Sequence, residues 1–458
     1  MMKYTDLLFL GAPLPEDVEK LKWHGDLAHA ARRIDQYLEG DIPQAQRSRL
    51  EAEKEVLSRL PDAYPLNWDA ALERFKSAFE DATAEELEEL ADNGAVDWIW
   101  CEGERRFIAN FVENLIKTRA AYSARAMGDF QKQVKENIAN VECLDKVILS
   151  MKEKGSSRWR FTLRESFTLK KDREDGPGVV RVHLPLPVEY AQVESFTLLK
   201  TSEEPTFIAP ATQSHRTIFF ERPMKAGETI DVEFTYTIRN DYVQPDPAKV
   251  LNEQPTFYTE EQLPHIALTP YIRALAAEIT GGEKNPLIRA RRIYDYITIH
   301  LMYSFVRPYM AITDIPGYAA SGWKGDCGIQ ALLFVTLCRA AGIPARWQSG
   351  LYSTPVVVGC HDWAQFYVEP YGWLFADCSF GGGAWRSGST MRHDFYFGNL
   401  EPFRMPAASD FQQEFSPARK FPRNDPYDNQ IGEAEYADRP MALDEFELKT
   451  ELLKAEEL

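Results

Sequence analysis

The first part of the chain carries apolar residues at spacings of three and four among many charged residues, a pattern typical of amphipathic helices. Residues 17–39 and 44–59 show it most regularly, and Thr83 followed by Glu86 is a capping-box sequence that predicts a helix start. The stretch 98–115 is the most apolar part of this region and is also expected to be helical. We therefore predict a helical region over residues 1–153 with a packing role. Partner binding or shaping of a substrate site is the alternative.

The pattern changes near residue 158 to strict alternation of apolar and polar positions, as in a half-buried strand. Shorter segments of similar character follow, separated by turn residues, at 179–186, 193–199, 217–220 and 229–239. Several short strands at such spacing predict an antiparallel β-sandwich. We place it at residues 154–245 and expect it to serve packing or recognition.

A third segment, residues 246–425, mixes helical and strand patterns and predicts an α+β fold built from a helix and an antiparallel sheet. Helices are expected at 269–280, 286–300 and 327–340, and strands at 345–352, 362–368 and 373–378. The remaining residues, 426–458, form an acidic tail that we expect to be a terminal helix or a frayed end.

Cys327 opens the most apolar of these helices. Asp326 is a suitable N-cap, Gly342 stands where a helix ends, and Pro344 prevents continuation. Unpaired backbone N–H groups and the helix dipole at such a position favour a thiolate over a thiol. A lone cysteine on a helix is usually a small buried hydrophobe, so this position needs partners before it indicates chemistry.

Two such partners follow, because His361 begins a predicted strand and Asp377 closes the next one. They are 16 positions apart, and an even separation places both side chains on one face of a hairpin. Direct opposition of the pair puts the tip near residues 369–370. A competing register, with 370–372 as a three-residue loop, keeps the shared face and separates the pair by four positions. We choose the first because the chemistry requires contact.

A cysteine, a histidine and an aspartate in these settings indicate nucleophilic acyl transfer. The thiolate of Cys327 would attack a carbonyl, His361 would protonate the leaving amine, and Asp377 would fix the ring's tautomer. The backbone N–H of Cys327 would be one oxyanion donor, with the second unassigned. Trp323 and Trp363 are the candidate substrate-binding residues, although a packing role explains both equally well.

The order of these motifs resembles the transglutaminase-like superfamily, a branch of the papain-like cysteine enzymes. The resemblance covers about residues 265–400 and rests on the helix at 290–296, the Gly-Asp-Cys-Gly sequence at 325–328, residues 339–346, His361 with Trp363, and residues 372–377. It implies that Cys327 is the nucleophile, His361 the base and Asp377 the orienting acid, without a cofactor.

The preceding strands also resemble the sandwich that precedes the core in bacterial members, and no family can be assigned to residues 1 to about 150. One departure is the negative charge of Asp326 and Asp362 beside the proposed nucleophile and base. Either side chain can point away, Asp326 into its cap.

A zinc site is the first competing interpretation, with Cys327, Cys360, His361, Cys378 and His393 as possible ligands. Adjacent strand residues 360 and 361 face opposite ways, and no C-x-x-C pair exists among the six cysteines, so we expect no metal. In the chosen register Cys360 and Cys378 would be buried thiols on the face opposite His361. A disulfide scaffold is equally unsupported.

The activity itself has three possible forms. Hydrolysis of a peptide or amide is favoured because water is the default acceptor of an acyl-enzyme. A protein-glutamine acyltransferase, which needs an amine to outcompete water, is the second form, and a non-catalytic binding module built on the same core is the third. The expected partner is therefore a peptide or protein, with the oligomeric state left open.

Composition narrows the remaining classes of function. The length of 458 residues predicts two or three domains, and the net charge of −18 argues against nucleic-acid binding, which needs a basic face. The apolar run near the N-terminus is short, interrupted by Asp6, and lacks the features of a secretory signal. No apolar run reaches the roughly 18 residues of a membrane span. We therefore expect a cytoplasmic protein.

Overall fold

The computed structural model describes residues 4–173 and 176–458. The chain divides into two compact units, each described here by itself. Unit 1 comprises residues 1–138, 261–272 and 300–333, and unit 2 comprises 139–260, 273–299 and 334–458. Helices α8 (Gly128–Lys154), α9 (Pro270–Thr280) and α12 (Cys327–Ala340) carry residues of both. Among the described residues, none of the helices has the length and apolar character needed to cross a bilayer.

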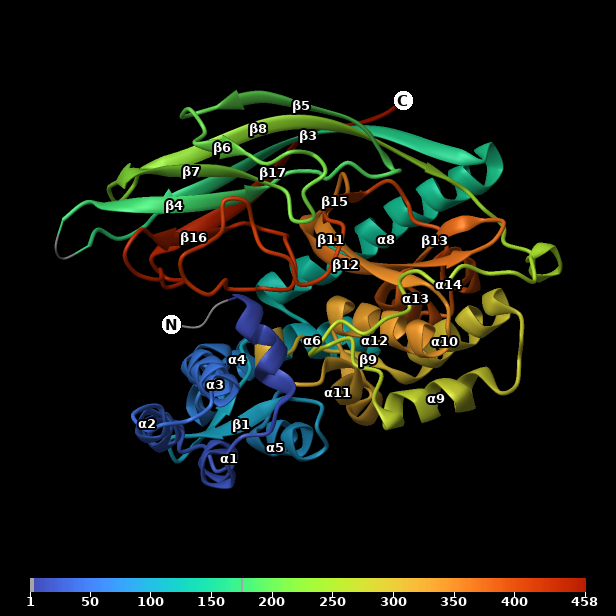
Figure 1. Ribbon diagram of the computed structural model, residues 1–458. Coiled ribbons are helices and arrows are strands. Elements are labelled where there is room, and N and C mark those ends of the chain that lie inside the picture. The colour runs from blue at the N-terminus through green and yellow to red at the C-terminus, as the bar shows by residue number, and fades with distance from the viewer. Residues whose placement is uncertain (1–3, 174–175) are drawn as a thin grey trace. The chain divides into compact units, whose positions relative to one another are not determined.

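Unit 1 is mostly helical, as the sequence predicts (Figure 1). Thr83 caps α5 by accepting a hydrogen bond from the backbone N–H of Glu86, which confirms the predicted helix start. The Glu86 carboxylate binds Arg125 and Tyr122, so the reciprocal bond of a capping box is not what holds it. Gly25, with a φ of +77°, lies between the first two α-helices of the chain. The helices are η1 (Tyr4–Gly11), α1 (Glu16–Trp23), α2 (Leu27–Leu38), α3 (Gln44–Ala63), α4 (Trp68–Ala78), α5 (Ala84–Asp92), α6 (Phe111–Thr118) and α7 (Ala120–Arg125).

The expectation of one helix over residues 98–115 is wrong. Strands β1 (Trp98–Cys101) and β2 (Glu104–Phe107) form a hairpin, and helix α6 begins only at Phe111. The two-residue loop has φ values of +50° at Glu102 and +82° at Gly103, as a tight hairpin turn requires. A short apolar run does not by itself distinguish strand from helix, and the turn at Gly103 decides the outcome.

The helical region shares unit 1 with the segment that leads to Cys327. This segment contains β9 (Met302–Tyr303), η3 (Tyr309–Ala311), α11 (Ile315–Gly322) and β10 (Lys324–Gly325), with β9 and β10 paired in parallel. Asn114 of α6 donates to the Ser304 hydroxyl at 3.3 Å and accepts from the Phe305 backbone N–H at 2.8 Å. Lys117 lies 3.5 Å from the centre of the Tyr303 ring. Helix α6 therefore packs against the segment that precedes the predicted nucleophile, Cys327.

Unit 2 contains two four-stranded sheets, drawn one above the other in Figure 1. One has the strand order β17-β3-β8-β5 and the other β16-β4-β7-β6. Buried side chains alternate along β3 and β8, which is the pattern that the sequence predicts for half-buried strands. The strands are β3 (Ser156–Leu169), β4 (Gly178–Pro185), β5 (Val193–Thr201), β6 (Phe207–Ile208), β7 (Thr217–Met224), β8 (Thr229–Asp241), β16 (Glu433–Tyr436) and β17 (Phe446–Glu457).

The acidic tail is neither a helix nor a frayed end, because it supplies a strand to each of these sheets. Strand β17 pairs with β3 over its whole length, and β16 pairs with β4, so the red and green strands lie side by side in Figure 1. The alternating Lys and Glu residues of β17 resemble a solvated helix in sequence. Pairing with β3 overrides that local signal, and charges on an edge strand discourage association with other chains.

The rest of unit 2 is the α+β segment, and the predicted α+β class is confirmed. Its five-stranded sheet has the order β14-β13-β12-β11-β15 and antiparallel pairing throughout. The elements are η2 (Pro247–Lys249), α10 (Pro286–His300), β11 (Ala345–Ser353), β12 (Val358–Val368), β13 (Gly372–Ala376), α13 (Cys378–Arg386), α14 (Thr390–Phe395), β14 (Phe397–Gly398) and β15 (Arg404–Ala408), together with most of α9.

Candidate active site

Cys327 is the first residue of α12, as predicted, and its side chain is partly exposed. Asp326 caps the helix by accepting the Ile329 N–H at 3.1 Å, and it also accepts the Tyr309 hydroxyl at 2.5 Å. The carboxylate is therefore engaged by its own helix and by Tyr309, as the sequence analysis anticipates for a cap. Gln330 donates to the Gly325 carbonyl at 2.8 Å, which fixes the turn before the cysteine.

The other end of α12 closes as the sequence predicts. The N–H of Ile343 donates to the Cys338 carbonyl at 2.8 Å, and that of Gly342 donates to the Arg339 carbonyl at 2.9 Å. These two bonds form a Schellman motif, and Gly342 adopts the left-handed φ of +73° that the motif requires. The register of α12 is thus fixed at both ends, which determines that Cys327 occupies its first turn.

His361 lies within β12, and Asp377 directly follows β13. The hairpin pairs Val368 with Gly372 and Ala364 with Ala376, two residues away from direct opposition of His361 and Asp377. The predicted register is therefore wrong, and so is the competing one. The hairpin closes at Gly372, whose φ of +75° is a left-handed conformation that glycine adopts without strain, and this closure sets the observed register.

The structure nevertheless brings the two predicted residues together. His361 Nε2 lies 2.8 Å from Asp377 Oδ2, and both side chains are buried. The two-residue offset is even, so the shared face is kept. The ladder ends at Ala376, and the chain turns at Asp377 into α13, which lets the carboxylate reach back to the imidazole.

Asp377 accepts four hydrogen bonds. Its Oδ1 accepts the backbone N–H of Phe380 at 2.9 Å and the Ser379 hydroxyl at 3.2 Å, so the residue also caps α13. Its Oδ2 accepts His361 and, at 2.8 Å, Arg404. Burial alone would raise the pKa of Asp377, but the charges of His361 and Arg404 outweigh it and hold the pKa well below its usual range.

Arg404 of β15 is a residue that the sequence analysis missed. Its guanidinium is 1% exposed and bridges Asp377 to Glu401, whose Oε1 accepts the Arg404 Nε–H at 2.9 Å. Burial raises the pKa of Glu401, and Arg404 opposes that rise. Glu401 precedes β15 by three residues, and a spacing of three indicates an ion pair only on a helix, so the sequence does not suggest this pair. Nothing there indicates that it meets Asp377.

Aromatic rings enclose the histidine. The Phe380 ring approaches the His361 ring edge-on at 4.7 Å, and the Trp363 ring lies nearly parallel to it at 6.3 Å. Trp363 is fully buried and donates its indole N–H to Gln348 at 2.6 Å. This placement does not suit the substrate contact predicted for Trp363, because a fully buried ring packs against the imidazole and presents no surface.

Trp323 is placed differently. It is 53% exposed and caps α11 in a left-handed conformation with a φ of +51°. Its ring lies 5.5 Å from that of His300. Trp323 is therefore an exposed aromatic side chain four residues before Cys327. Its role in substrate binding stays a prediction.

The two remaining neighbours of His361 point away from it along β12. Asp362 is buried and accepts a hydrogen bond from Gln430 at 2.7 Å. Cys360 is exposed, so the expectation that both Cys360 and Cys378 are buried holds only for Cys378. Cys360 lies in the exposed first part of β12, whereas Cys378 opens α13. Among the residues described, no group of three or more potential ligands could hold a metal ion.

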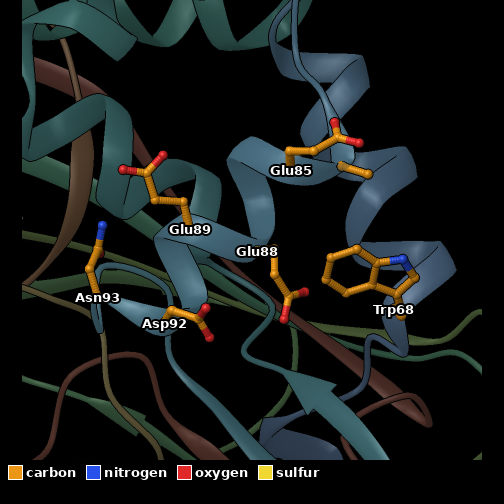
Figure 2. A pocket seen from close by; sticks show the side chains of 7 residues that line it. Trp68, Glu85, Glu88, Glu89, Asp92 and Asn93 are labelled. Carbon is orange, nitrogen blue, oxygen red and sulfur yellow. The ribbon is translucent and has the colours of Figure 1, made fainter.

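A surface hollow of about 710 Å³ occurs elsewhere, on unit 1. Figure 2 shows that its acidic side chains, Glu85 to Asp92, come from α5, with Trp68 of α4 opposite. Arg105 covers the face of Trp68 and pairs with Glu88. None of the predicted site residues lines this hollow, so it is a feature separate from the histidine and its partners.

Comparison with known proteins identifies the core. Residues 273–378 match the sequence model of the transglutaminase-like superfamily core, and the match includes Cys327, His361 and Asp377. The chain therefore carries a transglutaminase-like core, and the resemblance seen in the motifs is confirmed there. No curated protein matches the chain. The likeness of the preceding strands to those of bacterial members stays a prediction.

Several solved structures are similar to the chain. A candidate cysteine protease from Cytophaga hutchinsonii is 13% identical, with 65% of this chain and 91% of that one covered and a TM-score of 0.40. The periplasmic domain of TgpA from Pseudomonas aeruginosa is 15% identical, with 51% and 92% covered and a TM-score of 0.28. A candidate protease from Parabacteroides distasonis is 13% identical, with 48% and 59% covered and a TM-score of 0.19.

Proposed function

We propose that the transglutaminase-like core is a cysteine-dependent hydrolase of peptide or amide bonds. Cys327 is the nucleophile, His361 the general base and acid, and Asp377 the residue that orients the imidazole. The observation that carries this proposal is the buried hydrogen bond between His361 and Asp377, at the end of a sheet and within the family core. A cytoplasmic location fits the chain's composition and belongs to the same proposal.

The geometry of the histidine supports its assigned role. With Nε2 directed at Asp377, the proton on that nitrogen is held by the carboxylate, and Nδ1 is the nitrogen left for acid–base chemistry. Asp377 stays ionised at any working pH because its pKa lies well below the usual range. It can therefore stabilise an imidazolium without taking the proton itself.

The proposed reaction proceeds in two steps through a thioester. In the first, the Cys327 thiolate attacks the substrate carbonyl carbon, the carbon–nitrogen bond breaks, and the imidazolium of His361 gives its proton to the leaving amine. In the second, water attacks the thioester, His361 takes a proton from that water, and the carboxylic acid leaves as the thiolate returns. The backbone N–H of Cys327 at the start of α12 is one donor for the developing oxyanion.

The chain offers a matched control for a test of the nucleophile. Cys360 is exposed and lies on a strand, whereas Cys327 is only partly exposed and opens a helix, so faster labelling of Cys327 could not be explained by access. With a limiting amount of iodoacetamide at pH 6.5 and peptide mapping by mass spectrometry, we expect Cys327 to react at least about tenfold faster than Cys360. His361→Ala should remove that preference.

The outcomes separate the alternatives. Equal labelling of Cys327 and Cys360 in the wild-type protein would contradict the catalytic assignment and favour a binding module. If Cys327 is selectively labelled, incubation with a glutamine-containing peptide and a primary amine distinguishes hydrolysis from acyl transfer. We expect new amino termini or deamidated glutamine, and a majority of amine-linked product would replace the hydrolase with a transglutaminase.

A further inference from the structure

The ion network behind Asp377 is larger than a triad needs. His361, Asp377, Arg404 and Glu401 form a line of alternating charge in which His361 and Arg404 donate to the same carboxylate oxygen. All four side chains are between 0% and 6% exposed. In such an environment charges are weakly screened, so each of them affects the proton affinity of its neighbours.

Stability alone does not explain this network. Replacing a buried ion pair with apolar residues is often neutral or stabilising, because desolvation of the charges is costly. Here the cost is higher still, since one guanidinium nitrogen of Arg404 and Oε2 of Glu401 have no hydrogen-bond partner among the described residues. A polar network that is only partly satisfied points to a role in the chemistry of the group that it contacts.

We propose that Arg404 and Glu401 are positioning residues that hold the Asp377 carboxylate and set the proton affinity of His361 by opposing electrostatic effects. This inference rests on the proposed function for its catalytic meaning. The positive charge of Arg404 offsets the negative charge of Asp377 and so reduces the stabilisation that Asp377 gives to the His361 imidazolium. Glu401 partly neutralises Arg404 and so restores part of that stabilisation.

Arg404 and Glu401 are the charged side chains hydrogen-bonded in line behind Asp377, whereas Asp362, next to His361 on β12, binds Gln430. Five further titratable groups lie around the network, and burial raises their pKa values, which keeps them neutral near pH 7. These groups are Tyr352 of β11, Tyr396 after α14, Cys143 of α8, Tyr294 of α10 and Cys378 of α13. The remaining contacts of the guanidinium are rings, with Phe380 at 4.2 Å and Tyr352 at 4.9 Å.

The test is the titration of His361 by NMR in protein labelled with ¹³C at histidine. It is performed in a Cys327→Ala background, with the signal assigned by its loss in His361→Gln. Arg404→Gln should raise the His361 pKa by roughly one unit, because the carboxylate recovers its full effect. Glu401→Gln should lower it by a similar amount, because Arg404 is then uncompensated. Arg404→Lys should stay closer to the wild-type value than Arg404→Gln.

Opposite shifts are the signature that loosened packing would not produce. Shifts of the same sign in Arg404→Gln and Glu401→Gln, or no shift in either folded variant, would overturn the proposal. Circular dichroism verifies folding. If Arg404→Gln does not fold, Glu401→Gln provides the test, because it should still lower the His361 pKa, and an unchanged or raised pKa would overturn the proposal. The titration is measured without the Cys327 thiol, so its result does not depend on the labelling of Cys327. Failure of this proposal can therefore be distinguished from failure of the proposed function.

Discussion

Two helices of the core begin with the same dipeptide, an aspartate followed by a cysteine. Asp326 caps α12 ahead of Cys327, and Asp377 caps α13 ahead of Cys378. Each carboxylate accepts the backbone N–H three residues later. The backbone environment of the two thiols is therefore nearly the same, and any difference in chemistry must come from what surrounds them.

The surroundings differ strongly. Cys378 is buried, and desolvation together with the charge of Asp377 raises its pKa well above the usual range, so it stays a thiol. Cys327 is partly exposed, and its aspartate is engaged by the helix and by Tyr309. A helix N-terminus alone does not activate a cysteine, because burial outweighs the favourable dipole.

The largest expected effect separates the two cysteines. Cys327→Ala should reduce peptide or amide hydrolysis by at least about 10³-fold, because it removes the proposed nucleophile. Cys378→Ala should change kcat by less than a few-fold, because the buried Cys378 thiol has no role in the proposed mechanism. Activity of both purified variants on one peptide substrate checks this. Comparable losses in the two would remove the distinction between the helices.

The two aspartates provide the next comparison. Asparagine is as good an N-cap as aspartate, so Asp326→Asn and Asp377→Asn both preserve the helix start. Asp377→Asn should reduce kcat by about 10² to 10⁴-fold, since a neutral amide neither fixes the tautomer of His361 nor stabilises its charge. Asp326→Asn should stay within a few-fold of wild type. Steady-state kinetics decide, and a large loss in Asp326→Asn would mean that its charge also serves the site.

The stability that Asp377 contributes should depend on pH. The pKa of Asp377 is depressed in the folded state, so its contribution is fully present above the unfolded value of about 3.9 and is lost as the pH falls toward the folded value. We expect Asp377→Asn to cost about 3 kcal/mol at pH 7, because it breaks a buried ion pair. Below about pH 3.9 this difference should shrink by about 1.4 kcal/mol per pH unit. Urea unfolding at pH 7, 4 and 3 measures it, and a difference independent of pH would contradict the assignment.

Local signals in the sequence predicted the helix boundaries and the family motifs well. The cap at Asp326, the helix end at Gly342 and the helix start at Thr83 all depend on residues within a few positions of each other, and the structure has all three. The family resemblance was likewise carried by short motifs and is confirmed over residues 273–378.

What the sequence did not predict depends on contacts between distant residues. Arg404 reaches Asp377 because β15 pairs with β11 in the same sheet, and no spacing between positions 377 and 404 indicates it. Strand β17 forms because β3 accepts it as a partner, although its own residues favour a helix. The predicted register of the hairpin differs from the observed one by two residues. The prediction rested on contact between His361 and Asp377, whereas the turn that closes at Gly372 determines the observed register.

The smallest effect that we predict concerns the cap of α12. Asp326→Ala should lower the free energy of unfolding by about 1 kcal/mol, because it removes the acceptor of the Ile329 N–H, whereas Asp326→Asn should cost only a few tenths. Thermal unfolding of the two variants measures the difference. If the helix start itself helps to activate Cys327, iodoacetamide labelling of Cys327 should slow only in Asp326→Ala. Equal labelling in both variants would show that the cap contributes stability alone and that activation of the thiol depends on the histidine.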